Sequence, residues 1–236
     1  NNDGGGVSLN EVNATFENCI ISENTAANGA GINSVSSTVT VNNSSISDNV
    51  SSWEGGGIYC EGSSPILTNV TISGNTATVD GGGVYLTNNS SPVMSHLTMS
   101  GNSCDNHGGG IFMKNNSNPS FSNSILWNDL PQEIYMEGSG GGGPNNVTID
   151  HTNIQGGQDG IVPNDNGTIT WGDGNIDVDP MFADTANGNY HLLASSQCIN
   201  AGHPDSLDSD GTVADIGAYP YLNTYSGPTW YVQTDG

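Results

Sequence analysis

The stretch Gly81-Gly82-Gly83-Val84 is one copy of a glycine-rich motif that recurs at nearly constant intervals in the first half of the chain. The copies begin at residues 4, 29, 55, 81 and 108, so successive copies are 25, 26, 26 and 27 residues apart, and each is followed by Val or Ile. A repeat of this length that is rich in β-branched residues is typical of a solenoid, in which each repeat forms one turn, or rung, and stacks on the next.

A second motif repeats in the same phase. Its first copy runs from Phe16 to Asn24, and its alternating apolar residues indicate a β-strand and not a helix. Asn and Asp tolerate the left-handed backbone conformation of a tight corner, and stacked Asn side chains can hydrogen-bond between rungs. We therefore expect the last residues of the five copies to close these strands in that conformation and to form a structural ladder: Asn24, Asn49, Asn75, Asn102 and Asp129.

A third position in the repeat is marked by proline. The pairs Ser64-Pro65, Ser91-Pro92 and Asn118-Pro119 recur at steps of 27 residues, and proline fixes a turn there. Each repeat then holds three short strands, which predicts an all-β, right-handed parallel β-helix over residues 1–155 with rungs of about 26 residues. An antiparallel sandwich with glycine-rich turns is the alternative, but its turns would not keep a fixed phase.

Together these motifs resemble the repeats of bacterial right-handed parallel β-helix proteins that are secreted or displayed on the cell surface. The pairing of a glycine triplet and an aliphatic residue with Phe-x-Asn is similar to the repeat of chlamydial polymorphic outer-membrane proteins, over roughly residues 4–129. The order of segments between Asp177 and Tyr219 resembles the closing part of many secreted β-helix proteins. The resemblance implies an extracellular or cell-surface location and irregular capping rungs over residues 156–222.

The two ends of the chain suggest how copies could associate. Residues 223–236 are predicted to form a linker and a strand-like tail that contains Trp230, Tyr231 and Val232. The first rung is expected to be open, and an open edge is a template for another β-segment. The tail of one copy could add to the first rung of a neighbour and so build a filament end to end. The same features also fit one part of a longer covalent array.

The charge of the chain limits its partners. There are 24 acidic residues, one lysine and no arginine, for a formal net charge of −23. Such a chain repels nucleic-acid phosphates and anionic membranes, and it attracts cations. We therefore expect no nucleic-acid partner and no membrane insertion.

One acidic loop has the composition of a calcium site. Carboxylates in a short loop with glycine suit a hard cation that takes oxygen ligands, and a solvated acidic turn is the alternative. The candidate calcium ligands are Asp205, Asp208, Asp210 and Asp215. A weaker cluster combines residues 164–167 with Asp173, Asp177 and Asp179.

The cysteines and histidines show no zinc-like or catalytic spacing. We expect Cys19 and Cys60 to be inward-facing thiols, and a disulfide that involves Cys104 or Cys198 stays open. His96 stands where the other copies of Phe-x-Asn have asparagine, which favours a structural hydrogen bond. His107 precedes a glycine triplet and is expected to lie in a loop, and no triad-like motif connects His151, His191 and His203.

Two outward columns are candidates for contact with a ligand. Hydroxyl residues recur at 45 and 47, 71 and 73, and 98 and 100. A flat hydroxyl row can bind ice or crystalline glycans, although hydroxyls are also ordinary on a solvated sheet. Tyr59, Tyr85 and Phe112 form an aromatic column that can stabilise stacked strands or hold sugars. The structural interpretation is favoured for both columns.

The same composition argues against catalysis. Polyuronate lyases of the resembled fold depend on Arg and Lys, and hydrolases of that fold use clustered Asp, whereas this chain has one lysine and no column of Asp in its repeat. We therefore expect a non-catalytic extracellular structural or surface-display protein that associates with itself or with neighbouring modules. An adhesin or glycan-binding module and a polysaccharide-active enzyme are the alternatives.

Overall fold

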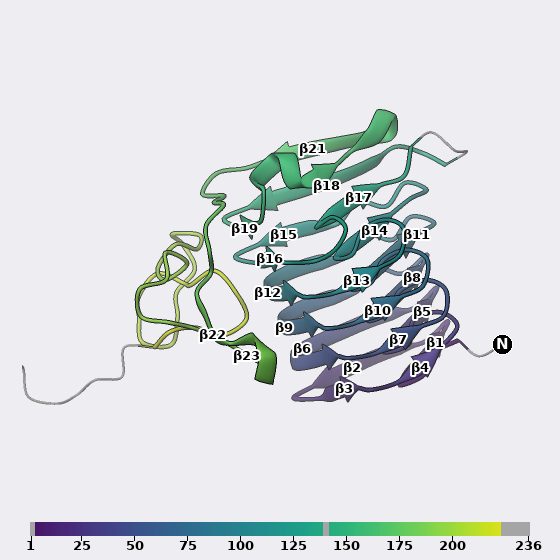
Figure 1. The fold of residues 1–236 in the computed structure, drawn as a ribbon, viewed down its shortest axis with the longest axis horizontal. Coiled ribbons are helices and arrows are strands. Elements are labelled where there is room, and N and C mark those ends of the chain that lie inside the picture. The colour runs from purple at the N-terminus through teal and green to yellow at the C-terminus, as the bar shows by residue number, and fades with distance from the viewer. Residues whose placement is uncertain (1–2, 139–141, 223–236) are drawn as a thin grey trace, which may run out of the picture.

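The computed structural model describes residues 3–138 and 142–222. These residues form a solenoid of stacked parallel strands, and a C-terminal segment, residues 177–222, packs against the side of the stack (Figure 1). The predicted all-β parallel solenoid is confirmed.

The first parallel sheet holds the strands that follow the glycine motifs. Its seven strands are β1 (Val7–Asn10), β5 (Ile32–Val35), β8 (Ile58–Glu61), β11 (Val84–Thr87), β14 (Ile111–Met113), β17 (Ile134–Met136) and β20 (Ile161–Val162). A short second sheet contains β4 (Thr25–Ala26), β7 (Val50–Ser51), β10 (Thr76–Ala77) and β13 (Ser103–Cys104).

The third and largest sheet holds the strands of the Phe-x-Asn motif. Its main path contains β2 (Asn13–Glu17), β6 (Thr38–Ser47), β9 (Ile66–Ser73), β12 (Val93–Ser100), β15 (Ser120–Ser122), β18 (Asn145–Asp150) and β21 (Gly167–Trp171). The shorter strands β3 (Ile20–Ser22), β16 (Ile125–Trp127) and β19 (Asn153–Ile154) complete it. The remaining elements are the antiparallel pair β22 (Phe182–Asp184) and β23 (Asn189–Leu192), and the 3-10 turns at Gly157–Gly160, Asn164–Asn166 and Thr185–Asn187.

The register between rungs equals the sequence repeat. Val7 pairs with Ile32, and Ile32 pairs with Ile58, so the residues after successive glycine motifs lie side by side. Pairing is parallel throughout the three solenoid sheets, which excludes the antiparallel sandwich.

Crowding between rungs explains the glycine motif. The first glycine of each triplet has a positive φ, such as +69° at Gly81, which residues with a Cβ rarely adopt. The third position faces the neighbouring rung, and a Cβ at Gly83 would lie 2.7 Å from the carbonyl oxygen of Gly110. Glycine is therefore required twice in this motif, once for conformation and once for space, whereas the middle position is alanine in one copy, Ala30.

The predicted Asn ladder is confirmed. The side-chain oxygen of Asn75 accepts hydrogen bonds from the backbone N–H and the side-chain amide of Asn49, at 3.0 and 2.9 Å. The amide of Asn75 donates in turn to Asn102 and to the carbonyl oxygen of Ile46, both at 2.9 Å. The same contacts continue from Asn24 at one end to Asp129 at the other. Because Asn49, Asn75 and Asn102 are buried, these hydrogen bonds are what makes their polar side chains compatible with the interior.

The left-handed backbone conformation was predicted at the ladder residues themselves, and this prediction is wrong by one position. A positive φ occurs at the residue before each ladder position: Glu23, Asp48, Gly74, Gly101 and Asn128. The corner is made there, and this leaves the ladder side chain free to point inward and stack on the next rung.

A second corner bends each strand of the largest sheet. It lies at six residues with φ between 43° and 54°, which we call the corner column: Asn18, Asn43, Asn69, His96, Asn123 and His151. Asn and His are among the residues that tolerate this conformation. The ring of His96 lies 3.2 Å from the amide nitrogen of Asn123, so the hydrogen-bonding role predicted for His96 is confirmed.

The solenoid continues past the boundary predicted at residue 155. β20 pairs with β17, and β21 pairs with β18, so residues up to about 171 still form rungs. The C-terminal segment then leaves the stack: the N–H of Ala218 donates to Thr98 Oγ1, and that of Gly217 donates to the carbonyl oxygen of Asn123, both at 2.9 Å. The prediction that residues 156–222 form capping rungs is therefore wrong for this segment, which covers the side of the solenoid.

Candidate ligand-binding groove

The corner column divides each strand of the largest sheet into two halves. The second halves carry the hydroxyl row on their outer face, and core residues such as Ile72 and Met99 point inward from the same strands. Four of its members are at most 6 % exposed because the C-terminal segment covers them: Thr71, Ser73, Thr98 and Ser100. These four hydroxyl groups therefore do not face solvent, and they do not form a flat exposed face that could bind ice or crystalline glycans.

An apolar patch explains why the C-terminal segment docks there. In β16 the outward positions hold Ile125 and Trp127, where β6, β9 and β12 have Ser or Thr. Ile125 is fully buried in a second hydrophobic cluster with Leu192, Cys198 and Ile216 of the C-terminal segment. Trp127 packs against the same cluster. The two apolar residues that interrupt the hydroxyl row are thus the anchor for the segment.

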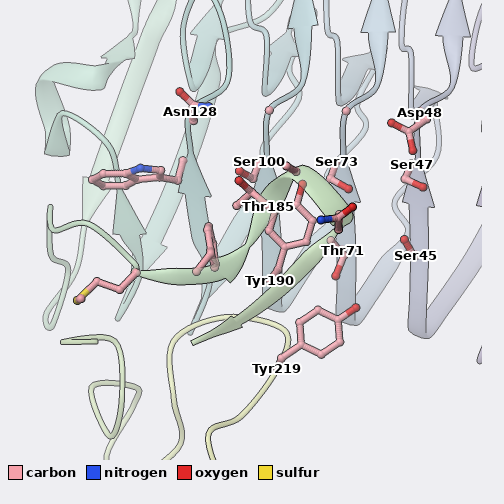
Figure 2. A pocket seen from close by; sticks show the side chains of 18 of the residues that line it. Ser45, Ser47, Asp48, Thr71, Ser73, Ser100, Asn128, Thr185, Tyr190 and Tyr219 are labelled. Atoms are coloured by element: carbon pink, nitrogen blue, oxygen red, sulfur yellow. The ribbon is translucent and has the colours of Figure 1, made fainter. Parts of the chain in front are cut away.

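A groove of about 980 Å³ runs between the hydroxyl row and the C-terminal segment. It crosses five neighbouring strands from Ile20 to Trp127, a length of about 19 Å at 4.8 Å per strand spacing. Figure 2 shows Ser45, Thr71 and Ser73 on the strands of its floor, with Tyr190 and Tyr219 on the C-terminal segment beside them.

Four aromatic side chains line the groove. Trp127 belongs to the floor, whereas Phe182, Tyr190 and Tyr219 belong to the C-terminal segment. Phe182 and Tyr190 meet edge to face with ring centroids 5.2 Å apart. Burial raises the pKa of Tyr190 above its ordinary value, so its phenol stays a neutral hydrogen-bonding group beside Ser73. The groove therefore combines apolar ring surface with neutral hydroxyl groups.

The polar lining is neutral or acidic. Asp48, Asn128 and Asp179 are exposed at the groove, and the hydroxyl oxygen of Thr71 is buried without a hydrogen-bond partner. Within the part of the chain that the structure describes, no Lys or Arg lines the groove. This lining suits an uncharged, hydroxyl-rich ligand better than an anion.

A second hollow of about 740 Å³ lies on the other side of Tyr219, between the corner column and residues 206–209. The predicted calcium loop forms one wall of it. Asp215 is buried and accepts the backbone N–H of Asn200 at 2.7 Å, while Asp208 accepts that of Asp215 at 3.0 Å. Asp210 accepts hydrogen bonds within its own turn. Asp205 is exposed.

The loop carboxylates thus serve as acceptors for the backbone of the loop. Among the described residues, no three of the four come together within 4.8 Å as a metal-binding group, and the weaker cluster around Asp173, Asp177 and Asp179 does not either. Calcium binding at either place stays a prediction.

A buried carboxyl pair ends the Asn ladder. Asp129 and Glu133 are only 3 % and 4 % exposed, and Glu133 Oε1 accepts the backbone N–H of Asp129 at 3.1 Å. The other carboxylate oxygen of each residue has no hydrogen-bond partner. Loss of solvation is the main cause that raises the pKa of Asp129 to about 7 and that of Glu133 to about 10. The pair therefore holds at least one proton at neutral pH. Sequence reasoning included Asp129 in the ladder but missed Glu133.

The aromatic column is longer and more enclosed than predicted. The rings of Tyr59, Tyr85, Phe112 and Tyr135 stack with centroid distances of 5.2, 5.0 and 5.7 Å. Tyr85 and Phe112 are buried, and the ammonium of Lys114 lies 5.2 Å from the centre of the Tyr85 ring. These contacts leave little ring surface for a sugar and support the structural interpretation. Tyr135 was missed because its rung is shorter than the others.

All four cysteines are free thiols, so no disulfide involves Cys104 or Cys198. Cys60 is buried as predicted, whereas Cys19 on the first rung is only partly buried. Burial raises the pKa of Cys60 to about 12 and that of Cys198 to about 11, which makes both thiols poor nucleophiles.

The family described as "Right handed beta helix region" matches residues 5–179. The chain therefore belongs to this family, and the predicted right-handed parallel β-helix is confirmed. Comparison with curated proteins and with solved structures gives no match. None of the helices among the described residues has the length and apolar character to cross a bilayer. The fold alone does not define an activity, because function depends on the site that the fold carries.

The residues predicted to mediate assembly, Trp230, Tyr231 and Val232, lie outside the described residues. Their role stays a prediction, as does the likeness to chlamydial repeats.

Proposed function

We propose that this chain is a non-catalytic extracellular β-helix protein that presents a glycan-binding groove. The observation that carries the proposal is the groove between the hydroxyl row and the C-terminal segment, with its aromatic rings and neutral hydroxyls. Sugar rings have apolar C–H faces that pack on aromatic side chains, and their hydroxyls exchange hydrogen bonds with Ser, Thr, Asn and Tyr. A groove that crosses five strands offers room for a short oligosaccharide chain.

The charge of the groove favours a neutral glycan. Asp48 and Asp179 would repel the carboxylates or sulfates of an acidic polysaccharide. The single lysine, Lys114, lies over Tyr85 in the aromatic column and does not line the groove. A chain of neutral hexoses or N-acetylated sugars is the class that this lining accepts.

Cleavage is the alternative against which binding has to be tested. Most glycoside hydrolases use two carboxyl groups that flank the bond to be broken. Asp48 and Asp179 line the groove, whereas the buried pair of Asp129 and Glu133 does not, and the non-catalytic role is part of the proposal. Support for a display role comes from the ladder and the aromatic column, because both connect rungs and provide a rigid base for the groove.

The test is a panel of immobilised neutral and acidic glycans probed with purified protein. We expect retention of at least one neutral glycan and none of the acidic ones, without release of soluble products. The substitution Trp127→Ala should weaken binding at least about tenfold, because it removes the aromatic ring that the floor of the groove supplies. Trp53→Ala is the matched control, since Trp53 is 61 % exposed and lies outside the groove.

Two results would overturn the proposal. Product release from any glycan would favour the polysaccharide-active enzyme, and equal binding by wild type and Trp127→Ala would place the ligand elsewhere. The extracellular location is tested separately by fractionation of the native cells, where the protein should be found in the medium or at the surface.

A further inference from the structure

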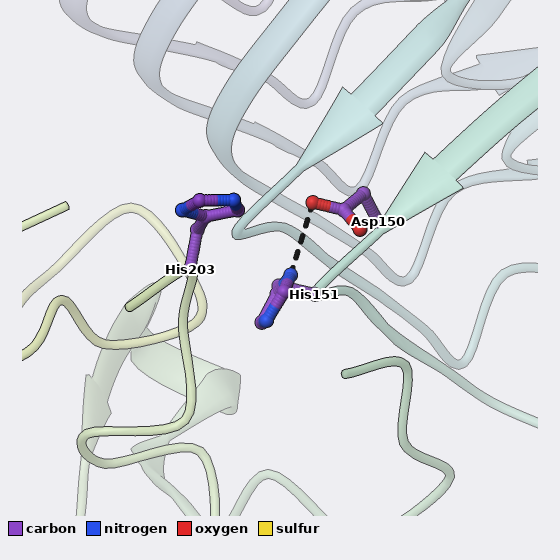
Figure 3. Close-up of side chains that lie close together, drawn as sticks. All are labelled: Asp150, His151 and His203. Atoms are coloured by element: carbon purple, nitrogen blue, oxygen red, sulfur yellow. Dashed lines mark hydrogen bonds and ion pairs between the residues drawn. The ribbon is translucent and has the colours of Figure 1, made fainter. Parts of the chain in front are cut away.

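Asp150, His151 and His203 come together where the C-terminal segment meets the solenoid (Figure 3). One ligand atom from each residue lies within 4.8 Å of the other two. Asp150 ends β18, His151 is the last member of the corner column, and His203 comes from the C-terminal segment. Only the fold brings them together, because 52 residues separate the two histidines (203 − 151).

The solenoid holds the first two side chains in place. His151 Nδ1 lies 2.9 Å from Asp150 Oδ2. Behind the ring, a Cβ at Gly174 would collide with His151, so the imidazole has no room to turn away on that side. The backbone N–H of His151 donates to the carbonyl oxygen of Asp173 at 2.8 Å, which fixes the corner itself.

The C-terminal segment delivers the third side chain. The backbone N–H of His203 donates to Asn123 Oδ1 at 2.7 Å, so His203 is tied to the corner column one rung below His151. The two imidazole rings lie 4.9 Å apart at an angle of 59°. The side chains of His151 and Asp150 retain 14 % and 34 % exposure, which leaves a path for an ion from solvent.

We infer that these three residues form a binding site for a divalent transition-metal ion, with zinc as the best fit. Two imidazoles and one carboxylate are a ligand set that zinc accepts, with a fourth position left for water. Ligand atoms about 2.0–2.2 Å from a tetrahedral zinc ion lie about 3.3–3.6 Å apart, so the 2.9 Å hydrogen bond between His151 Nδ1 and Asp150 Oδ2 has to widen by only about 0.5 Å to admit the ion. Calcium prefers oxygen ligands and is disfavoured by the two nitrogens.

Ion binding exchanges existing hydrogen bonds for metal bonds. Each neutral imidazole keeps one proton, on the ring nitrogen that faces away from the ion. For His203 the exchange removes the hydrogen bond in which Nδ1 accepts the N–H of Asp205 at 3.2 Å, an exposed and long contact. The formal charge of −23 favours uptake of a cation.

The ion would fasten the C-terminal segment to the solenoid. His203 belongs to the segment, whereas Asp150 and His151 belong to the last rungs, so the metal bonds add a cross-link across this junction. The complete site exists only when the C-terminal segment is docked on the solenoid. An ion that binds this folded state and not the unfolded chain raises the melting temperature of the protein.

The experiment uses the whole chain of 236 residues without a histidine tag. Zinc is titrated in competition with a chromophoric chelator, and cobalt absorption reports the coordination geometry. We expect one ion per chain, a tetrahedral cobalt spectrum and a melting temperature that rises with zinc. Because loss of even an outer contact weakens metal sites by about 10–100-fold, His151→Ala and His203→Ala should each weaken binding by more than about 100-fold.

His107→Ala is the matched control. His107 also faces a carboxylate, Asp80 at 3.3 Å, but no third ligand joins this pair among the described residues. Its zinc affinity should equal that of the wild type. Absence of one-to-one binding by the wild type, or unchanged affinity in His203→Ala, would overturn the inference. If a variant fails to fold, anomalous diffraction from zinc-soaked wild-type crystals decides, because a peak away from these three residues would contradict the site.

Discussion

The substitution Asp129→Asn should stabilise the protein at neutral and alkaline pH. At the other ladder positions the asparagine amide donates to the next ladder oxygen and to a carbonyl of the preceding rung, as Asn102 donates to Asp129 Oδ1 and to Ile72. An ionised carboxylate at position 129 has no hydrogen to donate, and its Oδ2 has no partner. Asparagine restores a donor there, directed at Glu133 Oε1 and at the carbonyl oxygen of Met99, the equivalent of Ile72.

The magnitude follows from proton linkage. Because the folded-state pKa values of both carboxyls are raised, the folded protein binds more protons than the unfolded chain, and stability falls as pH rises above about 4. For Asp129 this loss continues to about pH 7, so roughly three pH units at about 1.4 kcal/mol each set an upper limit of about 4 kcal/mol. Since the two carboxyls share the site, we expect Asp129→Asn to gain about 2–4 kcal/mol at pH 8.

The assay is thermal unfolding of wild type and variant at pH 4.5 and pH 8. We expect a rise of about 5–15 °C at pH 8 and little change at pH 4.5, where protonated Asp129 already supplies the donor. Asn102→Asp is the reverse control, because it places a second carboxyl inside the ladder and should lose stability as pH rises. Equal melting temperatures for Asp129→Asn and wild type at pH 8 would refute this account of the buried pair.

Four further outcomes test other parts of the account. Asn75→Ala should cost about 2–4 kcal/mol in chemical unfolding, because it breaks the ladder on both sides of its rung. Gly83→Ala should cost at least about 2 kcal/mol by the same measurement, since its Cβ meets the backbone of the next rung. If calcium raises the melting temperature through the acidic loop, Asp208→Ala combined with Asp210→Ala should abolish that rise. If native chains of 24.3 kDa form fibres, deletion of residues 229–236 should abolish them, as seen by electron microscopy.

The periodic part of the fold could be predicted because every rung repeats the same physical demands. Glycine is required where rungs approach most closely, and Asn is required where a buried polar side chain must both donate and accept. These demands recur at each rung, so the spacing in sequence equals the register in space. The ladder from Asn24 to Asp129 followed directly from this rule.

The candidate sites could not be predicted in this way because they depend on contacts that occur once. The C-terminal segment docks on the side of the solenoid through Ile125. The sequence signal for this docking was weak, because the first rung also has an apolar residue, Ile20, at the position equivalent to Ile125. Glu133 was missed because it falls in a shortened rung, outside the repeat. The approach of His203 to His151 had no sequence signal, since it depends on where the C-terminal segment returns to the corner column.

A neutral glycan in the groove beneath the C-terminal segment can be observed in a crystal structure. The crystals are grown with a neutral oligosaccharide that the protein retained in the glycan panel. We expect sugar density along the hydroxyl row, with one ring packed on Trp127 and others near Tyr190 and Tyr219. Density on another face of the solenoid, with the groove unoccupied at saturating oligosaccharide, would contradict this expectation.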